Sequence, residues 1–272
     1  MPYITAPDGT RLFYSDEGTG QPVLCLSGLS RNTRDFDYAM PALDGYRVIR
    51  MDYRGRGQSD WADYKSYTIP QEAQDVLQLL DHLELREVGV IGTSRGGLIA
   101  MGLGLAARDR LRGVCLVDIG PEIAATGLDV IRNYIGKNPK FQTHAEMAAA
   151  MPDLTRGFTN VPPSRWLEEV QKHYLETERG LQISYDPKLL DALLDAGAQP
   201  VPDLWPFFDG LQGIPLALIR GANSDLLTME TTNEMRKRRP DMLFADVPDR
   251  AHVPFLDEPE AVFILQTWAA ML

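Results

Sequence analysis

Cysteine, histidine and long apolar runs are all scarce in this chain of 272 residues. The two cysteines, Cys25 and Cys115, each lie inside a short apolar run, which predicts buried thiols and excludes a disulfide framework. The longest largely apolar stretch, residues 96–107, is far shorter than the ~20 residues that cross a bilayer. No basic and apolar secretory leader opens the sequence, so we expect a cytoplasmic protein.

Positive charge is also in short supply. Lys and Arg number 27 against 38 Asp and Glu, a formal net charge of −11. This balance argues against nucleic acid or an anionic membrane surface as the main partner. With 44% hydrophobic residues the chain can bury a sizeable core. A small-molecule substrate is the expected partner, and a monomer or homodimer the expected state.

Short apolar runs alternate with helical patterns along most of the chain. A hairpin is predicted over residues 3–14, with its turn at Asp8-Gly9. Further strands are predicted at 22–26, 46–51, 88–91, 113–117, 215–219 and 242–247, and helices at 68–83, 96–107 and 260–272. Strands that alternate with helices predict an α/β fold with a doubly wound, mostly parallel sheet.

The segment from 119 to 213 differs from the rest because it holds no convincing strand. Helix signals are frequent there: a capping box at Thr143 and Glu146, a helix after Ser164, and an N-cap at Asp186 for a helix with Gly197 just past its end. Almost a hundred residues are too many for a plain connection. The sequence therefore predicts a core of residues 1–118 and 214–272 and a helical insertion over 119–213.

Gly92-Thr93-Ser94-Arg95-Gly96 matches the pattern G-x-S-x-G. A buried strand precedes it and a Gly/Ala-rich helix follows, so the serine is expected on a sharp turn that lifts it out of the sheet. The helix N-terminus behind it favours developing negative charge. We interpret Ser94 as a nucleophile; the alternative is a glycine-rich turn with an incidental serine.

A serine nucleophile needs a base, and the base needs an acceptor that fixes its tautomer. His252 is the favoured base among four histidines, because it lies between the last strand and the last helix, at the carboxyl end of the sheet. Asp225, which follows the penultimate strand, is the favoured acceptor. Asp118, which follows the strand after the serine, remains the alternative.

Two backbone amides and two side chains complete the predicted site. The N–H groups of Leu29 and Arg95 are expected to stabilise the oxyanion. The Arg95 guanidinium must meet an anion if it is buried, either a protein carboxylate or a carboxylate of the substrate. Trp166, in the insertion, is a further candidate for substrate binding.

Taken together and in order, these segments resemble the α/β-hydrolase superfamily over essentially the whole chain. The matching residues are Asp52-Tyr53-Arg54-Gly55-Arg56-Gly57-Gln58-Ser59, the serine turn, residues 221–225, and His252 with Pro254, Leu256, Glu258 and Pro259. The resemblance implies an eight-stranded sheet with a helical cap after strand six. It also implies a Ser94-Asp225-His252 triad and no cofactor.

The resemblance narrows the expected reaction. Ser27-Gly28 stands where many relatives have His-Gly, a change also found in relatives similar to 3-oxoadipate enol-lactonases. The serine at the turn excludes haloalkane dehalogenases and epoxide hydrolases, which have aspartate there. We expect a serine hydrolase of a small carboxylic ester or lactone. The alternatives are a carbon–carbon bond hydrolase of dienoate ring-cleavage products, and a small-molecule receptor with slow residual hydrolysis.

Overall fold

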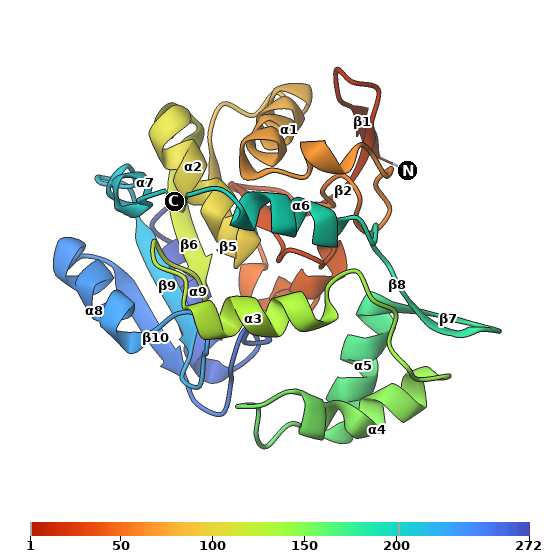
Figure 1. Ribbon diagram of the computed structural model, residues 1–272. Helices are drawn as coiled ribbons and strands as arrows, with labels where there is room; N and C mark the ends of the chain where they lie inside the picture. Colours follow the sequence, from red (N-terminus) through yellow and green to blue (C-terminus); the bar gives the residue numbers. More distant parts are fainter. Residues whose placement is uncertain (1, 201) are drawn as a thin grey trace.

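The computed structural model describes residues 2–200 and 202–272, and within them eight strands form one sheet. Their order is β1-β2-β4-β3-β5-β6-β9-β10 (Figure 1). Their bounds are β1 Tyr3–Thr5, β2 Arg11–Glu17, β3 Pro22–Leu26, β4 Arg47–Met51, β5 Val88–Thr93, β6 Leu111–Val117, β9 Leu216–Gly221 and β10 Leu243–Val247.

The predicted mostly parallel α/β sheet is confirmed. Strands β1 and β2 form the expected antiparallel hairpin, and β2 also pairs antiparallel with β4. All the other strand pairs of this sheet are parallel. Because chain order reverses between β3 and β5, the carboxyl end of β5 lies where ligands bind in open α/β sheets.

Helices cover both faces of the sheet, and the strands are apolar on both sides accordingly. In β3, Leu24 packs into the cluster that contains α1 (Ile69–His82) and α2 (Arg95–Ala106), whereas Cys25 packs into the cluster that contains α9 (Pro259–Ala269). Both cysteines are buried thiols, as predicted.

Two helices belong to the core although the sequence analysis did not assign them to it. Helix α8 (Met229–Arg238) connects β9 to β10 along the chain, is capped by the Thr228 side chain, and was not predicted. Helix α7 (Trp205–Asp209) belongs to the predicted insertion, but its Phe208 is fully buried in the main core cluster. The end of the predicted insertion therefore packs as part of the core.

We call residues 125–197 the cap. It contains α3 Ala125–Tyr134, α4 His144–Leu154, α5 Pro163–His173, β7 Tyr174–Thr177, β8 Gly180–Ile183 and α6 Leu189–Gly197. The β7–β8 hairpin, which projects from the cap in Figure 1, corrects the expectation of a strand-free insertion. Its turn needs Gly180 at φ +96°, a signal that the sequence analysis missed.

Local caps explain where the cap helices begin. Thr143 accepts from the Glu146 N–H at 3.2 Å, as its predicted capping box requires. Asp186 instead bonds the Lys188 N–H at 2.9 Å and accepts from Tyr67 Oη at 2.7 Å, so α6 begins only at Leu189, later than predicted.

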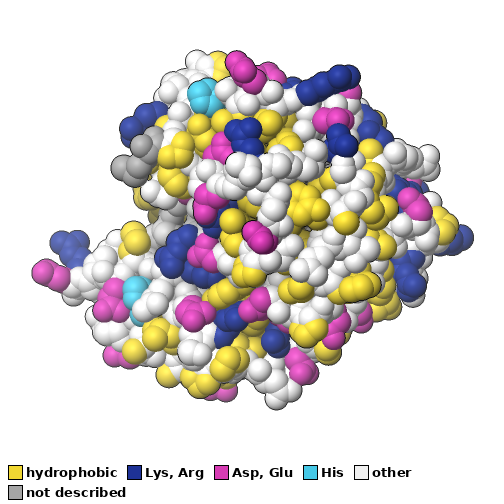
Figure 2. Space-filling view, turned by 180° about the vertical axis from the view of Figure 1, so that it is seen from behind, with side chains coloured by type: hydrophobic (Ala, Val, Ile, Leu, Met, Phe, Trp, Pro, Cys, Tyr) yellow, Lys and Arg dark blue, Asp and Glu magenta, His cyan; other side chains and the backbone are white. Residues whose placement is uncertain are grey.

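Short 3₁₀ turns complete the described structure, namely η1 Thr33–Phe36, η2 Met40–Leu43, η3 Tyr64–Ser66 and η4 Arg108–Arg110. Acidic and basic side chains are interspersed over the rear face of the molecule rather than segregated (Figure 2). Among the described residues, no helix has the length and apolarity to cross a membrane.

Candidate active site

Ser94 lies on a strained turn between β5 and α2. Its φ is +50°, a left-handed conformation that a residue with a side chain rarely adopts. The neighbouring glycines make the turn possible, because a Cβ on Gly96 would lie 2.1 Å from the Leu26 carbonyl oxygen and one on Gly92 2.6 Å from that of Gly96. The Ser94 N–H donates to Val117 O at 2.9 Å, which fixes the turn to β6. The hydroxyl is thus held at the carboxyl end of the sheet.

His252 reaches Ser94 from the loop between β10 and α9. Its Nε2 lies 3.0 Å from Ser94 Oγ, within hydrogen-bond distance. Its Nδ1 lies 2.7 Å from a carboxylate oxygen of Asp118. The structure thus brings together Ser94 and His252, 158 residues apart in the chain.

The carboxylate beside His252 belongs to Asp118, and the prediction of Asp225 in this place is wrong. Asp118 follows β6 directly and its side chain is fully buried. One oxygen accepts from the Gly221 N–H at 2.9 Å, and the other accepts from Ser224 Oγ at 2.6 Å and faces His252. Two donors, the Gly221 N–H and the Ser224 hydroxyl, therefore hold the Asp118 carboxylate toward the imidazole.

The two aspartates were hard to separate by sequence because β6 and β9 are adjacent parallel strands, so both follow strands that end beside His252. Asp225, however, lies on an exposed turn four residues past β9. At the position before it, Ser224 turns inward and donates to Asp118. A hydroxyl next to Asp225 was a signal for this arrangement that the sequence analysis did not use.

The loop that carries His252 is tied to the cap. Asp249 accepts from Thr159 Oγ1 at 2.6 Å and from Asn160 Nδ2 at 2.8 Å, and its own carbonyl accepts from the Thr159 N–H. Arg250 Nη1 donates to Thr159 O at 3.0 Å. Hydrogen bonds therefore hold the cap loop at Thr159 and Asn160 to the loop that carries His252.

Two backbone amides beside Ser94 are available as donors. Among residues 2–200 and 202–272, none accepts a hydrogen bond from the N–H of Leu29 or of Arg95. The loop that carries Leu29 is fixed because Ser27 O accepts from Gly96 N at 3.1 Å and from Tyr53 Oη at 3.1 Å. The Arg95 amide follows Ser94 in the chain, and the Leu29 amide belongs to the loop beside it. These are the two amides that the sequence analysis predicted as oxyanion donors.

The segment from Asp52 to Ser59 is hydrogen-bonded to the chain that follows this loop. The buried Asp52 carboxylate accepts from the N–H groups of Thr33 at 2.7 Å and Gln58 at 2.8 Å. Burial raises the pKa of Asp52 to about 6, and the two backbone hydrogen bonds oppose that rise. The segment thus joins the turn after β4 to the loop after β3.

The Arg95 guanidinium is engaged by the protein. Its Nε donates to Glu72 Oε2 at 2.5 Å and its Nη2 to Tyr67 O at 3.0 Å. Glu72 is fully buried and also pairs with Arg56 at 2.9 Å. Of the two partners that the sequence left open for Arg95, the structure shows the protein carboxylate, so the prediction of Arg95 as a substrate-binding side chain is corrected.

Trp166 also has a structural place. It is 4% exposed and packs edge-on against Phe158 and Phe255, with ring centroids 5.6 and 6.0 Å away. These rings, together with Met147 and Val170, form the interior of the cap where it meets the core. The structure therefore assigns Trp166 to packing instead of the predicted substrate contact.

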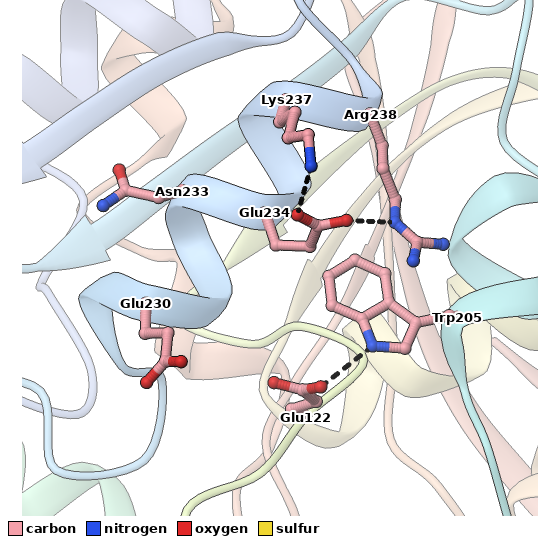
Figure 3. Close-up of a pocket in the computed structure, with 7 residues that line it drawn as sticks. All are labelled: Glu122, Trp205, Glu230, Asn233, Glu234, Lys237 and Arg238. Atoms are coloured by element: carbon pink, nitrogen blue, oxygen red, sulfur yellow. Dashed lines mark hydrogen bonds and ion pairs between the residues drawn. The ribbon is translucent and has the colours of Figure 1, made fainter.

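A surface hollow of about 450 Å³ lies between α7 and α8, and Ser94 is not part of its lining (Figure 3). Its lining residues are Glu122, Trp205, Glu230, Asn233, Glu234, Lys237 and Arg238. Most of its charges are paired: Glu234 meets Lys237 at 3.5 Å and Arg238 at 2.9 Å, and Glu122 accepts from Trp205 Nε1 at 3.0 Å. It contains no nucleophile with a base. The described part of the chain also holds no cluster of His, Cys, Asp or Glu suited to a metal ion.

Known proteins share both the sequence and the fold. The chain is 34% identical over 262 residues to a 3-hydroxybutyrate-oligomer hydrolase of Cupriavidus necator, covering 92% of this chain and 89% of the relative. It is 25% identical to an esterase of Mycobacterium tuberculosis, covering 90% and 81%. The crystal structure of an alpha/beta hydrolase from Novosphingobium aromaticivorans superposes with a TM-score of 0.92 at 34% identity, covering 100% of this chain and 98% of that one.

These relatives are hydrolases, which supports a hydrolase function for this chain. Residues 23–264, most of the chain, match the alpha/beta hydrolase family. The sheet, the serine turn and the sequence comparisons agree, and the chain belongs to the alpha/beta hydrolase family.

Proposed function

We propose that the protein is a serine hydrolase that cleaves a carboxylic ester through an acyl-enzyme. The observation that carries the proposal is the hydrogen-bonded series from Ser94 Oγ through the His252 imidazole to the Asp118 carboxylate. A serine hydroxyl becomes a competent nucleophile when a base accepts its proton, and the carboxylate stabilises the imidazolium that forms. No step of this reaction requires a cofactor.

In this mechanism Ser94 Oγ attacks the ester carbonyl while His252 Nε2 takes its proton. The N–H groups of Leu29 and Arg95 donate to the oxyanion that develops. His252 then protonates the departing alkoxide, which leaves an acyl group on Ser94. Water attacks this acyl-enzyme with His252 again as the base, and the acid is released with Ser94 restored.

The substrate class is suggested by the relative from Cupriavidus necator, whose name says that it hydrolyses oligomers of 3-hydroxybutyrate. We infer that short oligoesters of a hydroxy acid are candidate substrates of this chain as well. Such a molecule is an ester at each internal linkage and carries a carboxylate at one end. The esterase from Mycobacterium tuberculosis supports the same bond type.

The test combines turnover and covalent labelling. The purified protein should hydrolyse 4-nitrophenyl butyrate, and diethyl 4-nitrophenyl phosphate should add one diethylphosphoryl group to the peptide that contains Ser94. Ser94→Ala should lose both reactions. A panel of 3-hydroxybutyrate dimer, a lactone and a vinylogous diketone then separates ester, lactone and carbon–carbon cleavage. Equal turnover by the wild type and Ser94→Ala would refute the proposal.

A further inference from the structure

Arg31 lies beside the nucleophile on the loop between β3 and η1. Its N–H donates to Gly28 O at 3.2 Å, which folds the loop into a turn. A Cβ added to Gly28 would lie 3.3 Å from Arg31 Cγ and 3.9 Å from Ser94 Cβ. The aliphatic stem of Arg31 and the nucleophile therefore flank the same point.

The Arg31 guanidinium is partly buried yet forms no hydrogen bond with any of the residues the structure describes. Its side chain is 35% exposed, and the nearest carboxylates, of Asp35 and Glu169, are 3.9 and 3.8 Å from Nη1. These distances are longer than those of a charge-assisted hydrogen bond. The other arginines without a hydrogen bond are all exposed, namely Arg86, Arg156, Arg179 and Arg236.

The Arg31 guanidinium faces the cap, and its positive charge affects the pKa of ionisable side chains there. Burial raises the pKa of Tyr174, on β7, and of Tyr185, just after β8, and the positive charge of Arg31 opposes both rises. Burial would also raise the pKa of Glu169, on α5, but His173, Arg31 and Lys172 together lower it to about 2. Arg31 thus lies between the loop that follows β3, beside Ser94, and the cap elements that face this loop.

We propose that Arg31 binds a carboxylate of the substrate while the ester linkage lies at Ser94. The inference rests on the proposed function and deepens it, because it makes anionic esters such as the free acids of hydroxy-acid oligomers the preferred substrate class. A guanidinium presents five N–H donors in a fork that matches a carboxylate. Arg31 has these donors available, whereas those of Arg95 are taken up by Glu72 and Tyr67.

The net charge of −11 does not prevent this recognition. In physiological salt the field of distant charges is screened over ~8 Å, so the charges close to the ligand decide the interaction. Among them, the Glu169 carboxylate also faces Lys172 Nζ at 3.5 Å, which offsets its repulsion of an anion. Asp35 and Glu169 orient the guanidinium from beyond hydrogen-bond distance.

The test uses one ester bond in two charge states, the dimer of 3-hydroxybutyrate as the free acid and as its neutral terminal amide. Arg31→Gln should lower kcat/KM for the free acid by about 10- to 100-fold and leave that for the amide within about threefold. Arg31→Lys should recover part of the loss. Arg34→Gln is the matched control, because Arg34 lies three residues further along, in η1, is more exposed and donates to Gln171 O. This variant should behave as the wild type.

Equal losses on the two dimers in Arg31→Gln would overturn the inference and leave Arg31 a structural role. A second measurement needs no variant: 3-hydroxybutyrate should inhibit wild-type turnover of 4-nitrophenyl butyrate at least tenfold more strongly than its neutral amide does. Equal inhibition would also overturn the inference. Neither result bears on the proposed function, which fails separately if Ser94→Ala retains turnover of 4-nitrophenyl butyrate.

Discussion

Arg95 Nε donates a hydrogen bond of 2.5 Å to Glu72 Oε2, a carboxylate oxygen with no exposure to solvent. The side chain that follows the nucleophile therefore joins α2 to α1. Arg56 pairs with the other oxygen of the same carboxylate, so the buried Glu72 side chain forms ion pairs with two arginines. This geometry separates the roles of the two arginines near Ser94: Arg95 supports the fold, and Arg31 is left for the substrate.

Arg95→Met should reduce stability without changing substrate preference. Removal of one partner from a buried ion pair is destabilising, and since Arg56 still neutralises Glu72 we expect a loss of about 2 kcal/mol in the free energy of unfolding. Urea denaturation measures the loss, and kcat/KM for the neutral and anionic dimers should fall by the same factor. A selective loss on the anionic dimer would instead show that Arg95 contacts the substrate.

Ser94→Ala and His252→Ala should each remove nearly all turnover of 4-nitrophenyl butyrate. The double variant should be little worse than either single variant, because residues that act as one unit have non-additive effects. Steady-state rates of the three proteins provide the test. Losses that multiply in the double variant would show that the two residues act independently.

Gly96→Ala should be strongly destabilising. Its Cβ would lie 2.1 Å from Leu26 O, so β3 and the serine turn would have to separate, at a cost of about 3 kcal/mol or more. Gly102→Ala is the matched control in the same helix, because nothing lies within 4 Å of a Cβ there, and alanine should stabilise α2 by up to about 1 kcal/mol. Urea denaturation of both variants tests the pair, and similar stabilities would contradict the close packing of the turn.

Glu169 should make stability depend on pH in the acid range. Its pKa of about 2 in the folded protein is below the ordinary value of 4.5, so the carboxylate contributes stability above about pH 4.5 that is lost as the pH falls toward 2. At pH 3 the loss should be about 1–2 kcal/mol larger for the wild type than for Glu169→Gln, which keeps the contributions of the other carboxylates. Glu168→Gln, a change at the exposed neighbour, should keep the wild-type dependence. Parallel pH profiles for wild type and Glu169→Gln would contradict the assignment.

The sheet could be predicted well because buried parallel strands are short, apolar and rich in β-branched residues, and β3 was predicted to the residue. The β7–β8 hairpin could not, since only one of its two strands is largely buried and its alternation is brief. Helix α8 is strongly polar, so its buried side, with Met235, gave little periodic signal.

Within the site, local sequence was sufficient for Ser94, because the nucleophile turn depends on adjacent residues. The acid was not readable in the same way. The position of Asp118 beside His252 depends on the adjacency of β6 and β9, which only the three-dimensional fold provides. Arg31 was missed for a related reason: its lack of a hydrogen-bond partner among the described residues is a property of the folded loop and cap together.

The measurement that tests the account most directly is kcat for 4-nitrophenyl butyrate in Asp118→Asn and Asp225→Asn, prepared in parallel. Asp118→Asn should lower kcat by about 10⁴-fold, since asparagine cannot stabilise the imidazolium and favours the wrong tautomer. Asp225→Asn should stay within about threefold of the wild type, because Asp225 is exposed and His252 Nδ1 faces Asp118 instead. A severe loss in Asp225→Asn with a near-neutral Asp118→Asn would contradict the Ser94–His252–Asp118 assignment.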